Sequence, residues 1–276
     1  MDKSAFSYIT SCSELKHYLH GKANSLQNTS GGNARYLCHY TNLAAIISII
    51  QRKSWYLGSP LNMNDGLELS YAARTIWERI FFGSFMLEPK ESIAMWSMYA
   101  QPWSKGVIVR IPVVKMKKLV KSEPEIYCAN KDTKETEWSK MIPDAKISFH
   151  AVAYTNADSI SKAEEETLTC GGETNGRVAG ILTSQDLIGY VKNSAWSYEN
   201  EYRLRVDIPS DTYEAVSVKL PDDFIDSLEI VSGPRFDGDL LTEIQSRISG
   251  LVSKERVRKS LFDQKLNWVY CDSCRR

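Results

Sequence analysis

The chain has 276 residues, of which 43% are hydrophobic and 25% charged, as is typical of a folded globular protein. Its 34 Lys and Arg residues balance its 34 Asp and Glu residues, which excludes a general electrostatic attraction to nucleic acid or to a membrane surface. The sequence shows no apolar run long enough to cross a bilayer, and its start lacks the basic and apolar regions of a secretory leader, so we expect a cytoplasmic protein without a membrane partner.

Residues 1–33 are predicted to form an N-terminal helical extension and linker. Ser13 to His20 suits a short helix, and Asn24 to Asn33 has the polar, glycine-containing composition of a linker. At the other end of the chain, Cys271 and Cys274 form a C-x-x-C pair. Neither a second such pair nor a C-x-x-H accompanies it, so no metal site is predicted.

Residues 34–276 are predicted to form one domain in which strands and helices alternate irregularly. The expected strands are 35–40, 55–59, 107–111, 147–154, 196–206, 215–220, 228–231, 257–261 and 268–270. The expected helices are 42–53 after Thr41 as N-cap, a long stretch from Leu69 to Ile80, one around 93–99, a basic helix within 113–137, 184–192 and 240–251. The basic helix carries Lys115, Lys117, Lys118 and Lys121, and it is the best candidate for a local phosphate contact, although a charge run of this sort is usually a solvated face. Residues 159–176 have the composition of a surface loop.

The sequence contains neither a G-x-G-x-x-G motif nor a Walker A motif. Long runs of β-α units with glycine-rich phosphate turns are also missing. We therefore predict an α+β fold with a mixed or antiparallel split sheet and flanking helices, and not a Rossmann fold.

The stretch from Trp196 to Val206 is the best candidate for chemistry. Alternation at period two predicts a strand with Glu199, Glu201, Arg203 and Arg205 on one face. Two carboxylates on one face can divide the work at a substrate, one stabilising a developing cation and the other positioning a nucleophile. The alternative is a solvated edge strand whose glutamates and arginines neutralise one another.

Several short pieces, in this order, resemble the bacterial domain of unknown function 2971 family over most of residues 35–235. They are His39-Tyr40-Thr41, Ser59-Pro60, Asn64-Asp65, Trp96-Ser97-x-Tyr99-Ala100 with Gly106-Val107, and Trp196-x-Tyr198-Glu199-x-Glu201-x-Arg203. The chain departs from the usual family pattern at Gly66 and Leu67, where that family shows Pro-Phe, and at Met98, where it often shows His. These departures affect the shape of a loop more than its chemistry.

The order of a His39 strand, a Tyr56 to Ser59 strand and a late Glu199-Asn200-Glu201 also resembles the ADP-ribosyltransferase superfamily, and His39-x-Thr41 is similar to the opening of the DarT-type enzymes, which modify nucleic acid. The resemblance implies an ADP-ribosyltransferase-like domain that uses NAD as its substrate. Glu201 would grip the nicotinamide ribose and Glu199 would orient the acceptor. The residues implied in NAD binding are His39, Tyr40, Thr41, Tyr56, Ser59, Asn64, Trp96, Tyr99 and Arg203.

This resemblance implies a toxin-like or phage-defence effector. Its implied partners are NAD, a nucleic-acid (RNA or DNA) or protein acceptor, and an antitoxin or regulatory protein. Two other functions stay open: a non-catalytic binding module on the same scaffold, and an NAD glycohydrolase with water as the acceptor. Individual residues also have structural alternatives, since His39, Trp96 and Tyr99 suit a core, and Arg203 and Arg205 suit structural ion pairs.

Overall fold

The computed structural model describes residues 36–62, 68, 74–87, 91–155, 189–209, 213–248 and 252–263. The predicted extension 1–33, Asn64, the 159–176 loop, the 268–270 strand and the Cys271/Cys274 pair lie outside these residues. Within the described ranges, no helix is long and apolar enough to cross a membrane.

A large mixed sheet forms the frame of the molecule. Its strands are β1 (Tyr36–Asn42), β2 (Ser54–Gly58), β3 (Ile80–Leu87), β4 (Gly106–Pro112), β5 (Ile126–Ala129), β6 (Thr136–Met141), β7 (Lys146–Ala151), β10 (Glu201–Asp207), β11 (Ala215–Lys219), β12 (Glu229–Ser232) and β13 (Val257–Lys259). The order is β13-β12-β4-β1-β3-β2-β11-β5-β6, and β10 pairs with β3 and β7. These pairs are antiparallel except for the parallel pair of β12 with β13. A separate parallel pair joins β8 (Ala153–Thr155) to β9 (Val191–Asn193).

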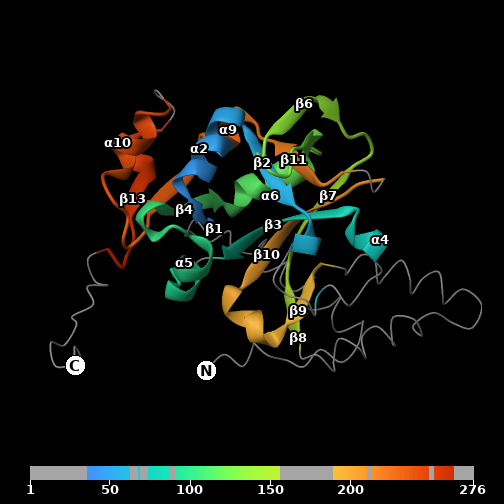
Figure 1. The fold of residues 1–276 in the computed structure, drawn as a ribbon, viewed down its shortest axis with the longest axis horizontal. Helices are drawn as coiled ribbons and strands as arrows, with labels where there is room; N and C mark the ends of the chain where they lie inside the picture. The colour runs from blue at the N-terminus through green and yellow to red at the C-terminus, as the bar shows by residue number, and fades with distance from the viewer. Residues whose placement is uncertain are drawn as a thin grey trace, which may run out of the picture.

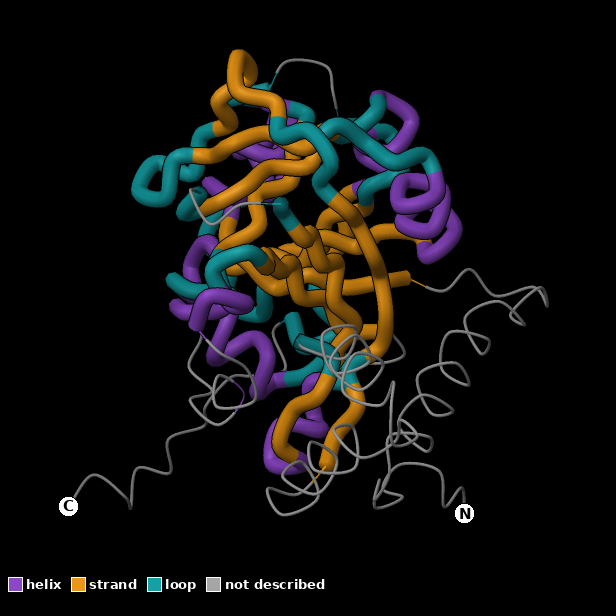
Figure 2. Tube along the Cα trace, turned by 90° about the vertical axis from the view of Figure 1, so that its right-hand side faces the viewer, coloured by secondary structure: helices purple, strands orange, loops and turns teal. Residues whose placement is uncertain are grey.

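The helices are short and lie around the strands, which run through the middle of the molecule in Figure 2. They are α2 (Leu43–Arg52), α4 (Arg74–Trp77), α5 (Ile93–Tyr99), α6 (Val113–Lys121), α9 (Asp222–Ile225) and α10 (Leu240–Gln245), with 3-10 turns η1 (Pro60–Asn62), η2 (Trp103–Lys105), η3 (Ser194–Glu199) and η4 (Lys254–Arg256). The predicted α+β class with a mixed sheet is therefore confirmed.

Helix α2 shows how the sequence specifies its element. Its buried stripe includes Leu43, Ile46, Ile47 and Ile50, the helical spacing that predicts an amphipathic helix. Its N-cap is Asn42, whose Oδ1 accepts a hydrogen bond from the backbone N–H of the third helical residue. The predicted cap, Thr41, is instead the last but one residue of β1, so the cap prediction was wrong by one position.

Strand β3 is the largest departure from the predicted elements. The helical pattern was expected to run to Ile80, but Ile80 begins β3, and six of the eight β3 residues are buried. A strand that is covered on both faces loses the alternation of apolar and polar residues that marks a strand in sequence. Strand β3 also lies next to β1, which carries His39, and next to β10, which carries Glu201.

Smaller corrections concern where elements begin and end. The predicted 147–154 strand is divided at Val152 into β7 and β8. The end of the predicted 184–192 helix is strand β9, and α10 ends at Gln245 instead of 251. Figure 1 shows β8 and β9 extending below the main sheet, beside the 3-10 turn that precedes β10.

The sheet opens along one edge of β3. The other edge pairs with β10 from Ile80 to Met86. On the open edge, β3 meets β1 only at Met86 and Leu87, and β2 only at Phe82. The side chains of His39 on β1 and Trp55 on β2 meet beside the gap, with ring centroids 5.1 Å apart. This opening therefore places His39 next to the middle of β3.

Candidate functional site

The Glu199-Asn200-Glu201 segment is a bend between two elements, so the prediction of one continuous strand from Trp196 was wrong. Glu199 ends η3, Glu201 begins β10, and Asn200 lies between them with φ 41°. This left-handed conformation is one that Asn tolerates better than most residues, and it turns the chain sharply. The two carboxylates are therefore not strand neighbours on one face, although the fold still brings them together.

Strand β10 is an interior strand, which excludes the predicted alternative of a solvated edge. It lies between β3 and β7, and residues 201–206 are all buried. Glu199 and Glu201 are only 3% and 4% exposed, and Arg203 is 0% exposed. Charged groups are buried this deeply only when other groups compensate their charge, so their partners decide what the cluster can do.

Arg203 is held between two carboxylates. Its Nε donates to Glu201 Oε1 at 2.7 Å and one terminal nitrogen to Glu201 Oε2 at 3.1 Å. The terminal nitrogens also bond both carboxylate oxygens of Glu68, and one donates to the carbonyl oxygen of Gly189 at 2.7 Å. These contacts match the structural ion-pair alternative, and they engage the guanidinium that was predicted to contact NAD.

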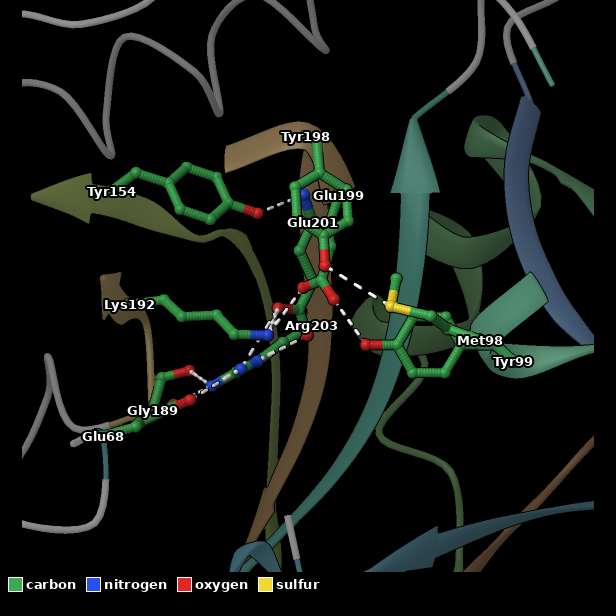
Figure 3. Close-up of polar contacts among 10 residues, drawn as sticks. All are labelled: Glu68, Met98, Tyr99, Tyr154, Gly189, Lys192, Tyr198, Glu199, Glu201 and Arg203. Atoms are coloured by element: carbon green, nitrogen blue, oxygen red, sulfur yellow. Dashed lines mark hydrogen bonds and ion pairs between the residues drawn. The ribbon is translucent and has the colours of Figure 1, made fainter. Parts of the chain in front are cut away.

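Lys192 joins the two glutamates (Figure 3). Its Nζ lies 2.6 Å from Glu199 Oε2 and 3.4 Å from Glu201 Oε2. It also lies 4.7 Å from the centroid of the Trp196 ring. The register of β8 with β9 pairs Lys192 with Tyr154, whose hydroxyl accepts a hydrogen bond from the Glu201 backbone N–H at 2.9 Å. The β8–β9 pair thus contacts the start of β10 through Tyr154 and Lys192, which lie side by side on the two strands.

The middle of β3 links Glu201 to His39. The Ser84 carbonyl oxygen lies 2.9 Å from His39 Nδ1, and Ser84 pairs with Arg203, the residue that bonds the Glu201 carboxylate. Because a carbonyl oxygen only accepts, Nδ1 must carry the proton. The neutral ring then presents Nε2 as an acceptor. The His39 ring therefore offers a hydrogen-bond acceptor, and Ser84 of β3 connects this ring to the strand that carries Glu201.

We expect nitrogen-15 chemical shifts to show His39 as the neutral Nδ1–H tautomer at pH 7. Burial lowers the pKa of this imidazole, and the hydrogen bond to Ser84 opposes that effect only in part. The chain has only four histidines, so the loss of one set of signals in His39→Gln assigns the resonance. A protonated ring at pH 7, or a proton on Nε2, would contradict this geometry.

The partners of the two glutamates push their pKa values in opposite directions. Burial by itself would raise the pKa of Glu201, but the charges of Arg203 and Lys192 outweigh it and lower that pKa to about 2. Burial raises the pKa of Glu199, and Lys192 offsets this only in part while Glu201 adds to it. Glu201 is thus a firmly ionised carboxylate, and Glu199 is the one whose charge depends on its surroundings.

Tyr99 connects the cluster to the surface. Its hydroxyl donates to Glu199 Oε1 at 2.5 Å, and the residue is 36% exposed. Burial, followed by the hydrogen bond to Glu199, raises the pKa of this phenol far above its usual range, so it stays a donor. Next to it, the exposed Tyr198 hydroxyl lies 3.6 Å from the sulfur of Met98. Of the predicted site residues, Tyr99 is the one that offers this cluster a surface-facing side chain.

Five further predicted site residues that the structure describes do not join the cluster. Tyr40 and Trp96 are buried and pack edge to face, with ring centroids 5.2 Å apart. Thr41 is also buried in β1, where it pairs with β4. Tyr56 lies under the ammonium group of Lys134, and Ser59 bonds the backbone of its own loop. The structure therefore brings together His39, Tyr99, Glu199, Glu201 and Arg203 from the predicted set.

Four residues of the cluster were missed by sequence reasoning: Glu68, Ser84, Tyr154 and Lys192. Lys192 lies seven positions before Glu199, but a single lysine at that spacing has no recognisable pattern. With all three carboxylates ionised, Glu68, Glu199 and Glu201 face Lys192 and Arg203, which leaves one net negative charge. Within the described residues, no group of three or more His, Cys, Asp and Glu side chains could hold a metal ion.

Comparison with known proteins adds one finding. Residues 95–204 match the model of the family described as Protein of unknown function (DUF2971). The match confirms the predicted resemblance over this segment, which begins in α5 and ends in β10 and includes Tyr99, Lys192, Glu199 and Glu201. No curated protein and no solved structure matches the chain.

Proposed function

We propose that this protein, whose central segment matches the DUF2971 model, is an NAD-dependent ADP-ribosyltransferase of the toxin or phage-defence kind. One observation carries the proposal: strand β3 lies between His39, whose ring bonds the Ser84 carbonyl oxygen, and β10, where Arg203 pairs with Ser84 and holds Glu201. A neutral histidine acceptor beside a permanently charged carboxylate suits the recognition of a ribose that becomes cationic as its glycosidic bond breaks.

The cluster offers a role for each side chain in this reaction. Glu201 would stabilise positive charge on the nicotinamide ribose electrostatically, because its carboxylate is buried and keeps its charge. His39 Nε2 would accept a hydrogen bond from a ribose hydroxyl. Glu199 would orient or deprotonate the acceptor, since it is the glutamate next to the surface-facing Tyr99.

The acceptor in this proposal is a nucleic acid or a protein. The basic helix α6 was the predicted local phosphate contact, but the Nζ atoms of Lys115 and Lys118 lie 3.1 Å and 2.8 Å from the same carboxylate oxygen of Asp223. These ion pairs reduce the positive charge of α6. An antitoxin or regulatory partner belongs to the same proposal, as does a cytoplasmic location.

A second candidate, a non-catalytic binding module, is favoured by a different observation. Each carboxylate oxygen of Glu199 and Glu201 already has a partner from Tyr99, Lys192 or Arg203. Saturated carboxylates of this kind also occur in ion-pair networks that only stabilise a fold. Measurement must therefore separate a reactive cluster from a purely structural one.

The deciding experiment is titration of NAD into the full chain, together with incubation of labelled NAD in a lysate. Nicotinamide release is measured, and the label is followed separately in the nucleic-acid and protein fractions. Label in either fraction, lost in Glu201→Gln, supports the transferase and identifies its acceptor class. Nicotinamide release without label transfer supports the glycohydrolase. A folded protein with neither NAD binding nor release supports the binding module.

We expect Glu199→Gln to separate transfer from hydrolysis. A residue that positions or deprotonates the acceptor contributes roughly 100-fold or more to transfer, whereas water attack on the ribose does not need it. Transfer of label should therefore fall by about that factor while nicotinamide release stays within a few fold of wild type. Equal losses of both activities would show that Glu199 does not act on the acceptor.

A further inference from the structure

Lys192 is placed to control the charge of Glu199. It lies on β9, outside the main sheet, yet its ammonium group is buried and reaches both glutamates, at 2.6 Å from Glu199 and 3.4 Å from Glu201. The Trp196 ring covers a further side of the ammonium group at 4.7 Å. The ammonium group of Lys192 thus contacts two carboxylates and one aromatic face. All three groups attract a cation and stabilise the charged form of the lysine.

The surroundings of Glu199 show that its charge depends on this one lysine. The groups that face it are the Tyr99 hydroxyl from α5, the Tyr198 phenol beside it in η3, Lys192 from β9, and Glu201 from β10 with Arg203 and Glu68 behind it. The Tyr154 hydroxyl approaches from β8. Arg203 is bonded to the two other carboxylates, so among the described residues Lys192 is the cation that contacts Glu199 directly.

We propose that Lys192 is a positioning residue that keeps the Glu199 carboxylate charged and fixed toward the acceptor. Its effect on the acceptor depends on the proposed transferase function, whereas its effect on Glu199 follows from their direct contact. Without Lys192, Glu199 would face the Glu201 carboxylate after losing the cation that contacts it. An uncompensated carboxylate is unfavourable in a buried site, and binding a proton lowers its free energy by removing the charge. A protonated Glu199 is no longer a base for an acceptor.

The test compares Lys192→Met with Lys192→Arg in the full chain. Methionine keeps the volume and apolar stem of the lysine without its charge, and arginine keeps the charge. Carbon-13 NMR of labelled glutamate follows the Glu199 carboxyl group against pH, and Glu199→Gln assigns its signal. We expect the Glu199 midpoint to move to higher pH in Lys192→Met and to stay near the wild-type value in Lys192→Arg. An unchanged or lower midpoint in Lys192→Met would overturn the proposal.

The pH profile of transfer is the second readout. In Lys192→Met, transfer at pH 7 should fall about tenfold for each unit by which the Glu199 midpoint exceeds the pH, and it should recover as the pH is raised. A uniform loss at every pH would instead indicate a merely structural role and would overturn the proposal. If the wild type transfers no label, the proposed function fails, while the NMR titration still decides whether Lys192 controls Glu199.

A double variant serves as the control for misfolding. Lys192→Met with Glu199→Gln removes one cation and one carboxylate, so the cluster keeps its net charge of one negative unit. We expect this protein to melt near the wild-type temperature and to show the low, pH-independent transfer of Glu199→Gln. If a folded double variant instead retains a pH-dependent recovery of transfer, the titrating group is not Glu199 and the proposal is wrong.

Discussion

Replacement of Glu201 by Gln is expected to reduce nicotinamide release by roughly 100- to 1,000-fold, the usual effect of removing one charge-stabilising group from a preorganised site. Glutamine keeps the size of the side chain and can still accept a hydrogen bond, but it carries no charge. Glu201 is the carboxylate that Arg203 and Lys192 keep ionised, so in the proposed reaction it is the group whose loss would remove most electrostatic stabilisation of a cationic ribose. Single-turnover release of nicotinamide at saturating NAD measures the effect.

The same substitution also affects stability, and this must be separated from catalysis. Glu201→Gln leaves Arg203 and Lys192 with one carboxylate fewer, and breaking a buried ion pair by removing one partner commonly costs about 3–5 kcal/mol. Thermal unfolding of Glu201→Gln therefore accompanies the release assay. A variant that is fully folded at the assay temperature and still releases nicotinamide about 100-fold more slowly has lost a catalytic group. If release falls only in proportion to the unfolded fraction, Glu201 has only a structural role.

The stability effect has a defined pH dependence. The Glu201 carboxyl has a folded pKa of about 2, below its usual value of 4.5, so its ionisation stabilises the folded state above pH 4.5 and this contribution is lost as the pH falls toward 2. The shift corresponds to roughly 3 kcal/mol. Denaturant unfolding between pH 6 and pH 3 should show a steeper loss of stability in wild type than in Glu201→Gln. Parallel curves would mean that the carboxylate is not held ionised by its partners.

Elements with a local signal of their own were the part of the fold that the sequence allowed us to predict. The buried stripe of α2 repeats at helical spacing, and β4 is a short apolar run bounded by turn residues. Strand β3 was missed because both its faces are buried. Predictions therefore failed where a segment owes its structure to its position between other strands and not to its own pattern.

The candidate site was only partly predictable for a related physical reason. Glu199 and Glu201 were identified from their spacing, but the bend at Asn200 was not, because one Asn in a polar stretch is compatible with either a strand or a turn. The ion-pair partners were missed because they are remote in sequence: Glu68 lies 135 positions before Arg203. Only the fold reveals that Arg203 is already paired and that Lys192 completes the cluster.

Replacement of Arg203 by Met should be the most destabilising single change in this cluster. The arginine side chain is 0% exposed and bonds Glu201, Glu68 and the Gly189 carbonyl, so methionine would leave two buried carboxylates without their main cation. We expect a loss of about 3–5 kcal/mol, or roughly 10 °C in melting temperature. Arg203→Lys should retain only part of the stability, since one ammonium group cannot form the paired bonds of a guanidinium.

The matched control for this prediction is Arg74→Met. Arg74 is also an arginine paired with a glutamate, Glu78, but its side chain is 79% exposed and the pair lies on the surface of α4 and the turn after it. Such pairs contribute about 0.3–0.5 kcal/mol, because water and salt screen them. In thermal and denaturant unfolding, the loss of stability in Arg203→Met should therefore be several times the loss in Arg74→Met. Equal, small losses would show that the buried network around Arg203 does not hold β10 in place, and the geometry proposed for Glu201 would lose its support.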